Sequence, residues 1–178
     1  MSQEIFDLYT DFLMASFRTT SATSLEELTE GEISHDKITR FLRFEEIGAK
    51  ELWKFAKPFL REIESDEGVI IVDDTISEKP YTDENEIICW HWDHTKQRNT
   101  KGINFVNCVY VLKGILVPVD CELVKKTKMV IDKETGNPRR ISEKRKNEIF
   151  RDLIQRSKRK NINFRLVLVI HGMVHRTI

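Results

Sequence analysis

Apolar residues recur at helical spacing through the first third of the chain. Helices are expected over residues 4–17, 21–44 and 49–64, where apolar side chains lie three or four positions apart. The second stretch contains a turn at Gly31, after which Ser34 is a suitable N-cap for a further helix. The third stretch is expected to be kinked or interrupted around Pro58. Residues 1–66 are therefore expected to form a small all-helical domain.

Branched and aromatic residues replace the helical pattern in the rest of the chain. Strands are expected over residues 68–75, 85–94, 103–112 and 115–124. Residues 135–140 predict a turn or loop, and residues 142–160 predict a helix with one apolar face. Leu166–Val169 is an unbroken apolar run, as expected of a strand covered on both faces. With a boundary near Glu67, residues 67–169 are expected to form an α/β unit.

Length and composition restrict the class of protein. The chain has 178 residues, 40% hydrophobic and 33% charged, as expected of one globular domain, alone or with a small appendage. Its three cysteines, Cys89, Cys108 and Cys121, have neither disulfide-framework nor zinc-ribbon spacing and are expected to be reduced. No apolar run approaches the roughly 20 residues of a membrane helix, and the N-terminus lacks the basic segment of a signal peptide. A cytoplasmic location without membrane association is therefore expected.

The zero net charge of the chain hides an uneven distribution. Residues 1–95 contain 9 Lys and Arg against 22 Asp and Glu, hence −13, and residues 96–178 contain 20 against 7, hence +13. A basic half suggests a polyanionic partner such as nucleic acid, because Lys and Arg that neutralise phosphates release counterions. The alternative is that the two halves neutralise each other within one fold.

Two adjacent carboxylates end the first expected strand, in VIIVDDT. Strand ends present side chains to ligands at the mouth of a sheet, and hard cations such as Mg²⁺ prefer oxygen donors. Asp73 and Asp74 are therefore candidate metal ligands. The alternative is an aspartate–threonine pair that caps a turn.

Three stretches together resemble a known enzyme family: VDDTISEKP, ICWHWDHTKQRNTKGINFVNCVYV and EKRKNEIFRDLI. They resemble the DDE transposases of bacterial insertion sequences over residues 20–169, and residues 20–42 are similar to the helical, helix-turn-helix-like DNA-binding region of that family. The resemblance implies an α/β fold, a ribonuclease H-like mixed sheet preceded by a small all-helical domain. It also implies metal-dependent DNA cleavage and strand transfer, with Mg²⁺ as cofactor and transposon ends as partner. Asp73 would be the first catalytic carboxylate and metal ligand, with Asp74 the less suitable choice.

The resemblance is incomplete at the next catalytic position. In the family, a second Asp ends the strand after the helix and a Glu lies on a later helix; here Ile170 stands at the second position and no such helix follows. The prediction is a truncated transposase with a partial ribonuclease H-like core. Two-metal catalysis needs ligands for ions about 3.5–4 Å apart, and Asp74 points away from Asp73 in a strand. The chain is therefore expected not to cut DNA.

Two roles stay open for a chain of this kind. One is a DNA-binding regulator without catalysis, which occupies transposon ends, alone, as a homo-oligomer or together with intact transposase. The other is a relic without a selected role. Both follow from the missing carboxylates, and they differ in whether a folded chain still binds DNA.

Residues 170–178 follow neither a helical nor an alternating pattern. This segment can be encoded by codons that also contain a second message. If one nucleotide is inserted before the codon of Ile170, the shifted frame encodes Asp-Ser-Trp in place of Ile-His-Gly. Asp-Ser-Trp is similar to the second catalytic motif of the family, so a shifted reading frame is predicted to explain this ending. The alternative is that the segment is native.

Histidines supply two weaker candidates for metal binding. His91, Asp93 and His94 form an imidazole–carboxylate group, but strand alternation places His94 on the other face. If this strand forms a hairpin with the first strand, His94 is expected roughly 15–20 Å from Asp73. His171 and His175 have i, i+4 spacing but no acidic partner.

Basic residues are the candidates for DNA contact. Those proposed are Lys37, Arg40, Arg43, Lys96, Arg98, Lys101, Lys144 and Lys146. The first three recur on one side of an expected helix whose other side is apolar, as in a helix that packs on its core and presents a basic face to DNA. A solvated helix face is the alternative.

Overall fold

The computed structural model describes residues 3–17, 20–44, 48–133 and 136–170. The chain divides into two compact units, Met1–Ile47 and Gly48–Ile178. The first is all-helical and the second combines helices with a mixed sheet, so the α/β class predicted from the sequence is confirmed. The division falls before the expected boundary near Glu67, because the helix over residues 49–63 packs on the sheet and so belongs to the second unit.

Three helices form the first unit. They are α1 (Gln3–Ala15), α2 (Ala22–Leu28) and α3 (His35–Phe44). Phe12, Leu25 and Ile38, one from each helix, are buried together as its core. Gly31 has a φ of 85°, which glycine adopts at little cost, and the turn there separates α2 from α3. The Ser34 hydroxyl accepts a hydrogen bond from the Lys37 amide at 3.4 Å, as its position predicted for an N-cap.

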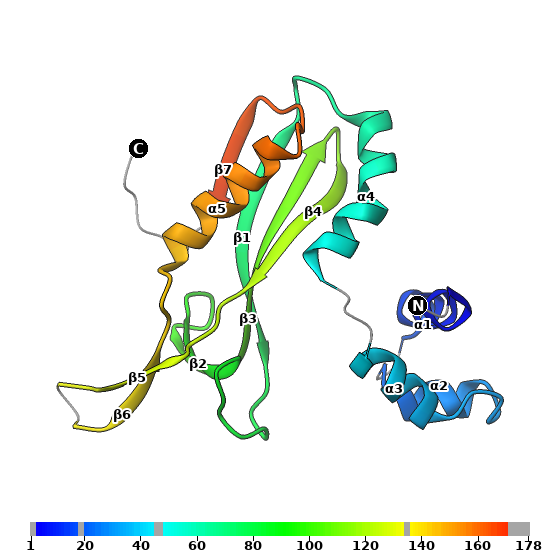
Figure 1. Ribbon diagram of the computed structural model, residues 1–178, viewed down its shortest axis with the longest axis horizontal. Helices are drawn as coiled ribbons and strands as arrows, with labels where there is room; N and C mark the ends of the chain where they lie inside the picture. The colour runs from blue at the N-terminus through cyan, green and yellow to red at the C-terminus, as the bar shows by residue number, and fades with distance from the viewer. Residues whose placement is uncertain (1–2, 18–19, 45–47, 134–135, 171–178) are drawn as a thin grey trace. The chain divides into compact units, whose positions relative to one another are not determined.

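A five-stranded sheet organises the second unit (Figure 1). Its strands are β1 (Val69–Glu78), β2 (Ile88–Asp93), β3 (Arg98–Leu112), β4 (Ile115–Leu123) and β7 (Leu166–Ile170). The long strand β3 pairs antiparallel with β1, with β2 near its start and with β4 near its end. β7 pairs parallel with β1. The sheet is therefore mixed, and the last strand lies beside the first.

Two helices cover one face of this sheet. They are α4 (Ala49–Ile63), which is not interrupted at Pro58, and α5 (Lys146–Arg159). Leu60 of α4 and Leu153 of α5 share one core with Ile70 and Tyr110 of the sheet. On β1, Ile70 alternates with Val69 and Ile71, which are partly exposed on the opposite face. That second face, which we call the open face, has no helix over it among the described residues (Figure 1).

The strand β7 is exposed along its whole length. The exposed fractions of its five apolar residues range from 37% for Val167 and Val169 to 58% for Leu166. Within the described residues β1 is its one neighbouring strand. The expectation that Leu166–Val169 is covered on both faces is therefore wrong. The residue pattern alone did not show how many elements lie around this strand.

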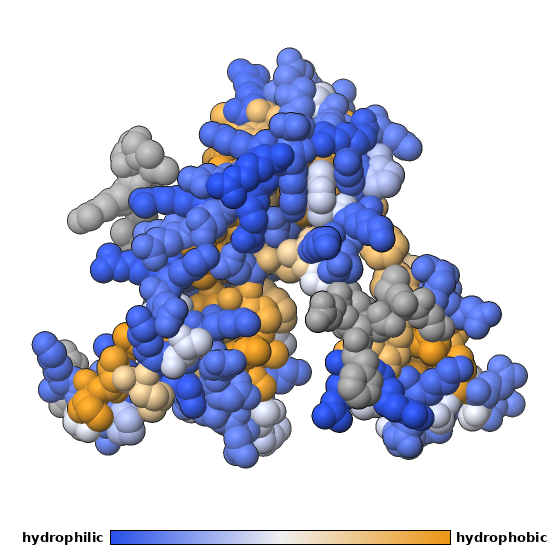
Figure 2. Space-filling model, viewed as in Figure 1, coloured by the Kyte–Doolittle hydropathy of each residue, from blue (hydrophilic) through white to orange (hydrophobic). Residues whose placement is uncertain are grey.

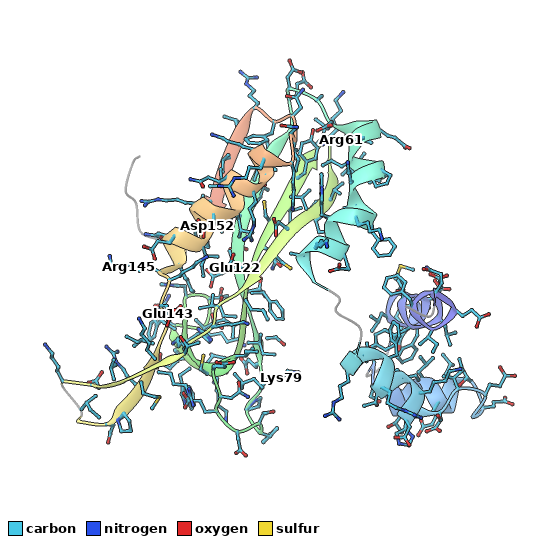
Figure 3. The ribbon with its side chains drawn as sticks, in the orientation of Figure 1. Arg61, Lys79, Glu122, Glu143, Arg145 and Asp152 are labelled. Carbon is cyan, nitrogen blue, oxygen red and sulfur yellow. The ribbon has the colours of Figure 1, made fainter. Side chains whose placement is uncertain are left out.

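Ion pairs fasten α5 to β4. Asp120, only 3% exposed, accepts hydrogen bonds from Arg156 at 3.0 Å and from Lys160 at 2.8 Å. The register of β3 against β4 shifts beside it, so that Val119 and Asp120 are both buried although they are adjacent. Glu122 binds Arg156 at 2.8 Å. Figure 3 labels Glu122 on β4.

A second, two-stranded sheet was missed by the sequence analysis. β5 (Lys128–Ile131) pairs with β6 (Pro138–Ile141), which includes residues expected to be loop. We call this two-stranded sheet the β5–β6 arm. Figure 2 shows hydrophobic surface on it, and its residues Met129 and Ile131 are 55% and 66% exposed. No helix within the described ranges is long and apolar enough to cross a membrane.

Loss of the buried charge at Asp120 should destabilise the second unit strongly. Asp120→Asn leaves Arg156 and Lys160 without their shared carboxylate, and we expect the free energy of unfolding to fall by about 3 kcal/mol. Asp152→Asn is the matched control, because Asp152 pairs with Lys144 at 41% side-chain exposure. Its cost should be about 0.5 kcal/mol or less. Urea unfolding followed by circular dichroism measures both, and equal costs would contradict the anchoring role of Asp120.

Candidate active site at the end of strand β1

The two adjacent carboxylates of β1 point to opposite faces of the sheet and have different environments. Asp74 lies on the helix-covered side, with a side chain 11% exposed. Its carboxylate accepts hydrogen bonds from Lys146 at 2.6 Å and from the Asn104 amide at 3.0 Å. These partners come from the first turn of α5 and from β3. The carboxylate of Asp74 is therefore already bound by side chains of its own unit.

Asp73 lies on the open face, and its side chain forms no ion pair with another described residue. Its carboxylate accepts a hydrogen bond from the Asp74 amide at 2.8 Å. Burial raises the pKa of the Asp73 carboxyl, and this backbone hydrogen bond offsets part of that effect. The nearby charge of Asp74 raises the pKa further, whereas Lys146 lowers it. The ionised form of Asp73 thus has a cost in the folded protein, which a cation in the site would relieve.

The parallel pairing of β1 with β7 places Ile170 next to Asp73. The register runs from Val69 opposite Leu166 to Asp73 opposite Ile170. Both residues are on the open face, since residues that pair across two strands share a face. Ile170 is 47% exposed and lines the same pocket as Asp73. The position predicted to hold a second catalytic aspartate is therefore adjacent to the first, and an isoleucine occupies it.

A pocket of about 390 Å³ surrounds this pair of positions. Its lining consists of Asp73–Ile76 from β1, Trp92–Lys96 from the end of β2 and the turn after it, and Ile170. The turn curls back toward β1, where Lys96 forms an ion pair with Glu78 and Arg98 lies 3.4 Å from the same carboxylate. Nearby, β3 and β1 approach each other closely at Gly102, because a Cβ there would lie 2.3 Å from the Ser77 carbonyl oxygen.

The predicted position of His94 is wrong. The estimate of its distance from Asp73 assumed that β2 pairs with β1, but β2 pairs with β3, and the turn brings His94 into the pocket that Asp73 lines. His91 is buried beside Cys89, with 3.3 Å between Nε2 and Sγ. Burial lowers the pKa of His91 to about 4, so it is neutral at pH 7. His171 and His175 lie outside the described residues.

The predicted DNA-contacting residues fall into two groups. Lys37, Arg40 and Arg43 are exposed on α3, and Lys96, Arg98 and Lys101 lie on or beside the turn at the pocket. Lys144 and Lys146 form the second group, which lies at the start of α5 or just before it and binds carboxylates of the protein, as Lys96 and Arg98 also do at Glu78. Lys144 contacts Asp152 at 2.8 Å and Glu122 at 3.4 Å. The sequence did not show that Lys146 would be the partner of Asp74, since 72 positions separate them.

Comparison with protein families identifies the group to which this fold and site belong. A family model described as DDE superfamily endonuclease matches residues 2–170. The chain belongs to this family. The match supports a transposase-type nuclease function and a DNA substrate for the DDE family, and the resemblance seen in the sequence is confirmed at that level. Comparisons with curated proteins and with solved structures gave no significant match.

DDE endonucleases typically use divalent metal ions, and the described residues of this member do not supply a complete site. In the part of the chain that the structure describes, no three His, Cys, Asp or Glu side chains are arranged to hold a metal ion. Asp73 provides one carboxylate, and its neighbour Ile170 offers no donor atom. The predicted frameshifted segment continues into residues 171–178, outside the described ranges, and its origin stays a prediction.

Substitution should separate the roles of the two carboxylates. Asp74→Asn removes the charge that Lys146 binds, and we expect the free energy of unfolding to fall by about 2 kcal/mol. Asp73→Asn should instead stabilise the protein at pH 7, because the raised pKa means that ionised Asp73 opposes folding.

The stabilisation by Asp73→Asn should depend on pH. It should shrink as the pH falls through the raised pKa and vanish below the ordinary aspartate pKa of about 3.9, where Asp73 is protonated in both folded and unfolded chains. Urea unfolding of both variants and the parent protein between pH 3 and 8 measures the effect. A loss of stability for Asp73→Asn at pH 7 would contradict this assignment.

Proposed function

We propose that this chain is a DDE transposase-type protein that binds DNA across the open face of its sheet and does not cleave it. The observation that supports this proposal is the pairing of Asp73 with Ile170 at the end of two parallel strands. Metal-dependent phosphoryl transfer uses ligands for two ions, and these two positions together offer one carboxylate. The family match supports DNA as the partner.

Two surfaces of the chain suit contact with DNA. On β3 and the turn before it, Lys101 has no side-chain partner among the described residues, and Lys96 and Arg98 share the single carboxylate of Glu78. In the helical unit, α3 presents Lys37 and Arg40 to solvent. The rest of that unit is acidic, since residues 1–47 contain 4 Lys and Arg against 10 Asp and Glu. Any DNA contact by the helical unit is therefore expected through α3.

DNA affinity should decrease steeply with salt and depend in part on α3. Each phosphate neutralised contributes about −0.9 to the slope of log affinity against log salt. Arg40→Ala/Arg43→Ala should weaken binding to a duplex about 10-fold at low salt and flatten this slope by about 2. Lys57→Ala, an exposed substitution on α4, should change neither.

Fluorescence anisotropy with a labelled duplex between 50 and 300 mM salt measures these values. Binding that does not change with salt would contradict the electrostatic part of the proposal. Absence of any DNA binding by a cooperatively folded protein would favour the second role considered from the sequence, a relic without a selected function.

A carboxylate at position 170 should raise the divalent-metal affinity of the pocket that Asp73 lines. Ile170→Asp places two carboxylates side by side on the open face, and we expect Mn²⁺ binding with a Kd on the order of 1 mM. Ile170→Asn is the matched control of similar size, and Ile170→Asp/Asp73→Asn tests whether both residues are needed.

Isothermal titration calorimetry with Mn²⁺ gives the readout, which does not depend on nuclease activity. Equal affinities of the aspartate and asparagine variants would show that position 170 does not face the same site as Asp73. Metal-dependent nicking of DNA by the parent protein, abolished by Asp73→Asn, would overturn the proposal that it does not cleave.

A further inference from the structure

Two large aromatic side chains stand exposed on β2. Trp90 and Trp92 are 50% and 46% exposed, whereas Cys89 and His91, which alternate with them, are buried. The third tryptophan, Trp53, packs against the core, and Lys160 lies 4.9 Å from its ring centroid. Neighbouring exposed tryptophans are unusual on a protein surface, and they mark a contact site.

The tryptophans share the open face with the carboxylate of Asp73. Trp90 pairs with Lys101 and Trp92 with Asn99 in the β2–β3 ladder, and alternation through β3 puts these residues on the same face as Asp73. Trp92 lines the pocket that contains Asp73. Trp90 lines a second pocket of about 270 Å³. The two indole rings therefore connect the carboxylate pocket with its neighbour.

Basic and amide side chains surround the second pocket. Besides Trp90 it is lined by Arg98, Asn99 and Lys101, with Glu78 as its acidic member. Lys96 and Arg98 both contact Glu78, so its charge is offset. These contacts lower the pKa of the Glu78 carboxyl, first through the hydrogen bond from Lys96, and it stays ionised and paired. The surroundings of Trp90 are thus cationic, which favours an anionic ligand there.

A ligand that fits this surface combines flat aromatic groups with regularly spaced negative charges. Single-stranded nucleic acid has both, because unpaired bases stack on aromatic rings while the backbone phosphates contact Lys and Arg. Bases in a duplex already stack on each other and do not offer their faces. Apolar peptides would use the indoles but not the cations beside them.

We propose that Trp90 and Trp92 form a stacking platform for unpaired nucleobases of DNA. Lys101 and Arg98 bind the phosphates of the same strand, which leads into the pocket beside Asp73. The proposal rests on the DNA binding proposed above and adds a preference for single-stranded ends over duplex. It assigns a ligand to two residues that take no part in the metal site.

Binding of two labelled probes by the full chain tests the platform. The probes are a ten-nucleotide oligothymidine and a blunt duplex of mixed sequence. Trp90→Leu/Trp92→Leu should weaken oligothymidine binding roughly 100-fold, about 10-fold for each lost ring, and change duplex binding less than 2-fold. Trp90→Phe/Trp92→Phe, which keeps an aromatic ring at each position, should lose less than 10-fold.

Two further measurements keep the test independent of folding. Lys101→Ala leaves both rings in place and should flatten the salt dependence of oligothymidine binding by about 0.7. In a Trp53→Phe background, oligothymidine should quench the remaining tryptophan fluorescence, because both remaining indoles lie on the platform. Urea unfolding of every variant checks that it folds.

The outcomes separate this inference from the proposed function. Duplex and oligothymidine binding that both persist in the leucine variant would overturn the platform and leave the DNA-binding function standing. If the parent protein binds neither probe, both the platform and the proposed DNA-binding function would be overturned. If the parent protein self-associates and the leucine variant is monomeric with unchanged oligothymidine binding, the tryptophans form an interface between copies, and the platform is again overturned.

Discussion

The parallel pairing of β7 with β1 is the constraint on which the candidate site depends. It places residues almost 100 positions apart in the chain side by side, Asp73 against Ile170. A parallel neighbour requires a crossing connection, which this chain provides with α5 over one face of the sheet. The buried Asp120 and its cations fasten α5 to β4. The ion pairs beneath the helix therefore support the geometry of a site on the opposite face.

Strand alternation gives the adjacent residues Asp73 and Asp74 different environments, although their side chains are chemically identical. Asp74 faces the helix side, where Lys146 and Asn104 satisfy its charge. Asp73 faces the open side, where burial makes ionisation unfavourable although Lys146 offsets part of this effect. The first arrangement stabilises the fold, and the second lowers stability in exchange for a carboxylate that is available to a ligand. One strand thus supplies both an anchor for α5 and a carboxylate on the open face from consecutive codons.

Much of this arrangement could be predicted from residue patterns. The order of helices and strands follows from apolar periodicity. The choice of Asp73 and position 170 as site positions follows from their places at strand ends combined with the family resemblance. The partner of β2 could not be predicted, because apolar alternation shows which residues face the core but not which strand lies alongside. The burial of Asp120 depends on a register shift that leaves no residue signature. The β5–β6 arm is short, and the proline and arginines of β6 indicate a loop when considered alone.

The bare edge of β7 has a consequence for how much of this protein a cell can hold. Among the described residues, the five apolar residues of β7 pair with β1 on one side and with no strand on the other, and such an edge is a template for strands of other molecules. Encounters between such edges increase with the square of concentration, whereas folding of a single chain does not depend on it. A low copy number therefore protects the chain from coaggregation, and overproduction should send it to chaperones and proteases.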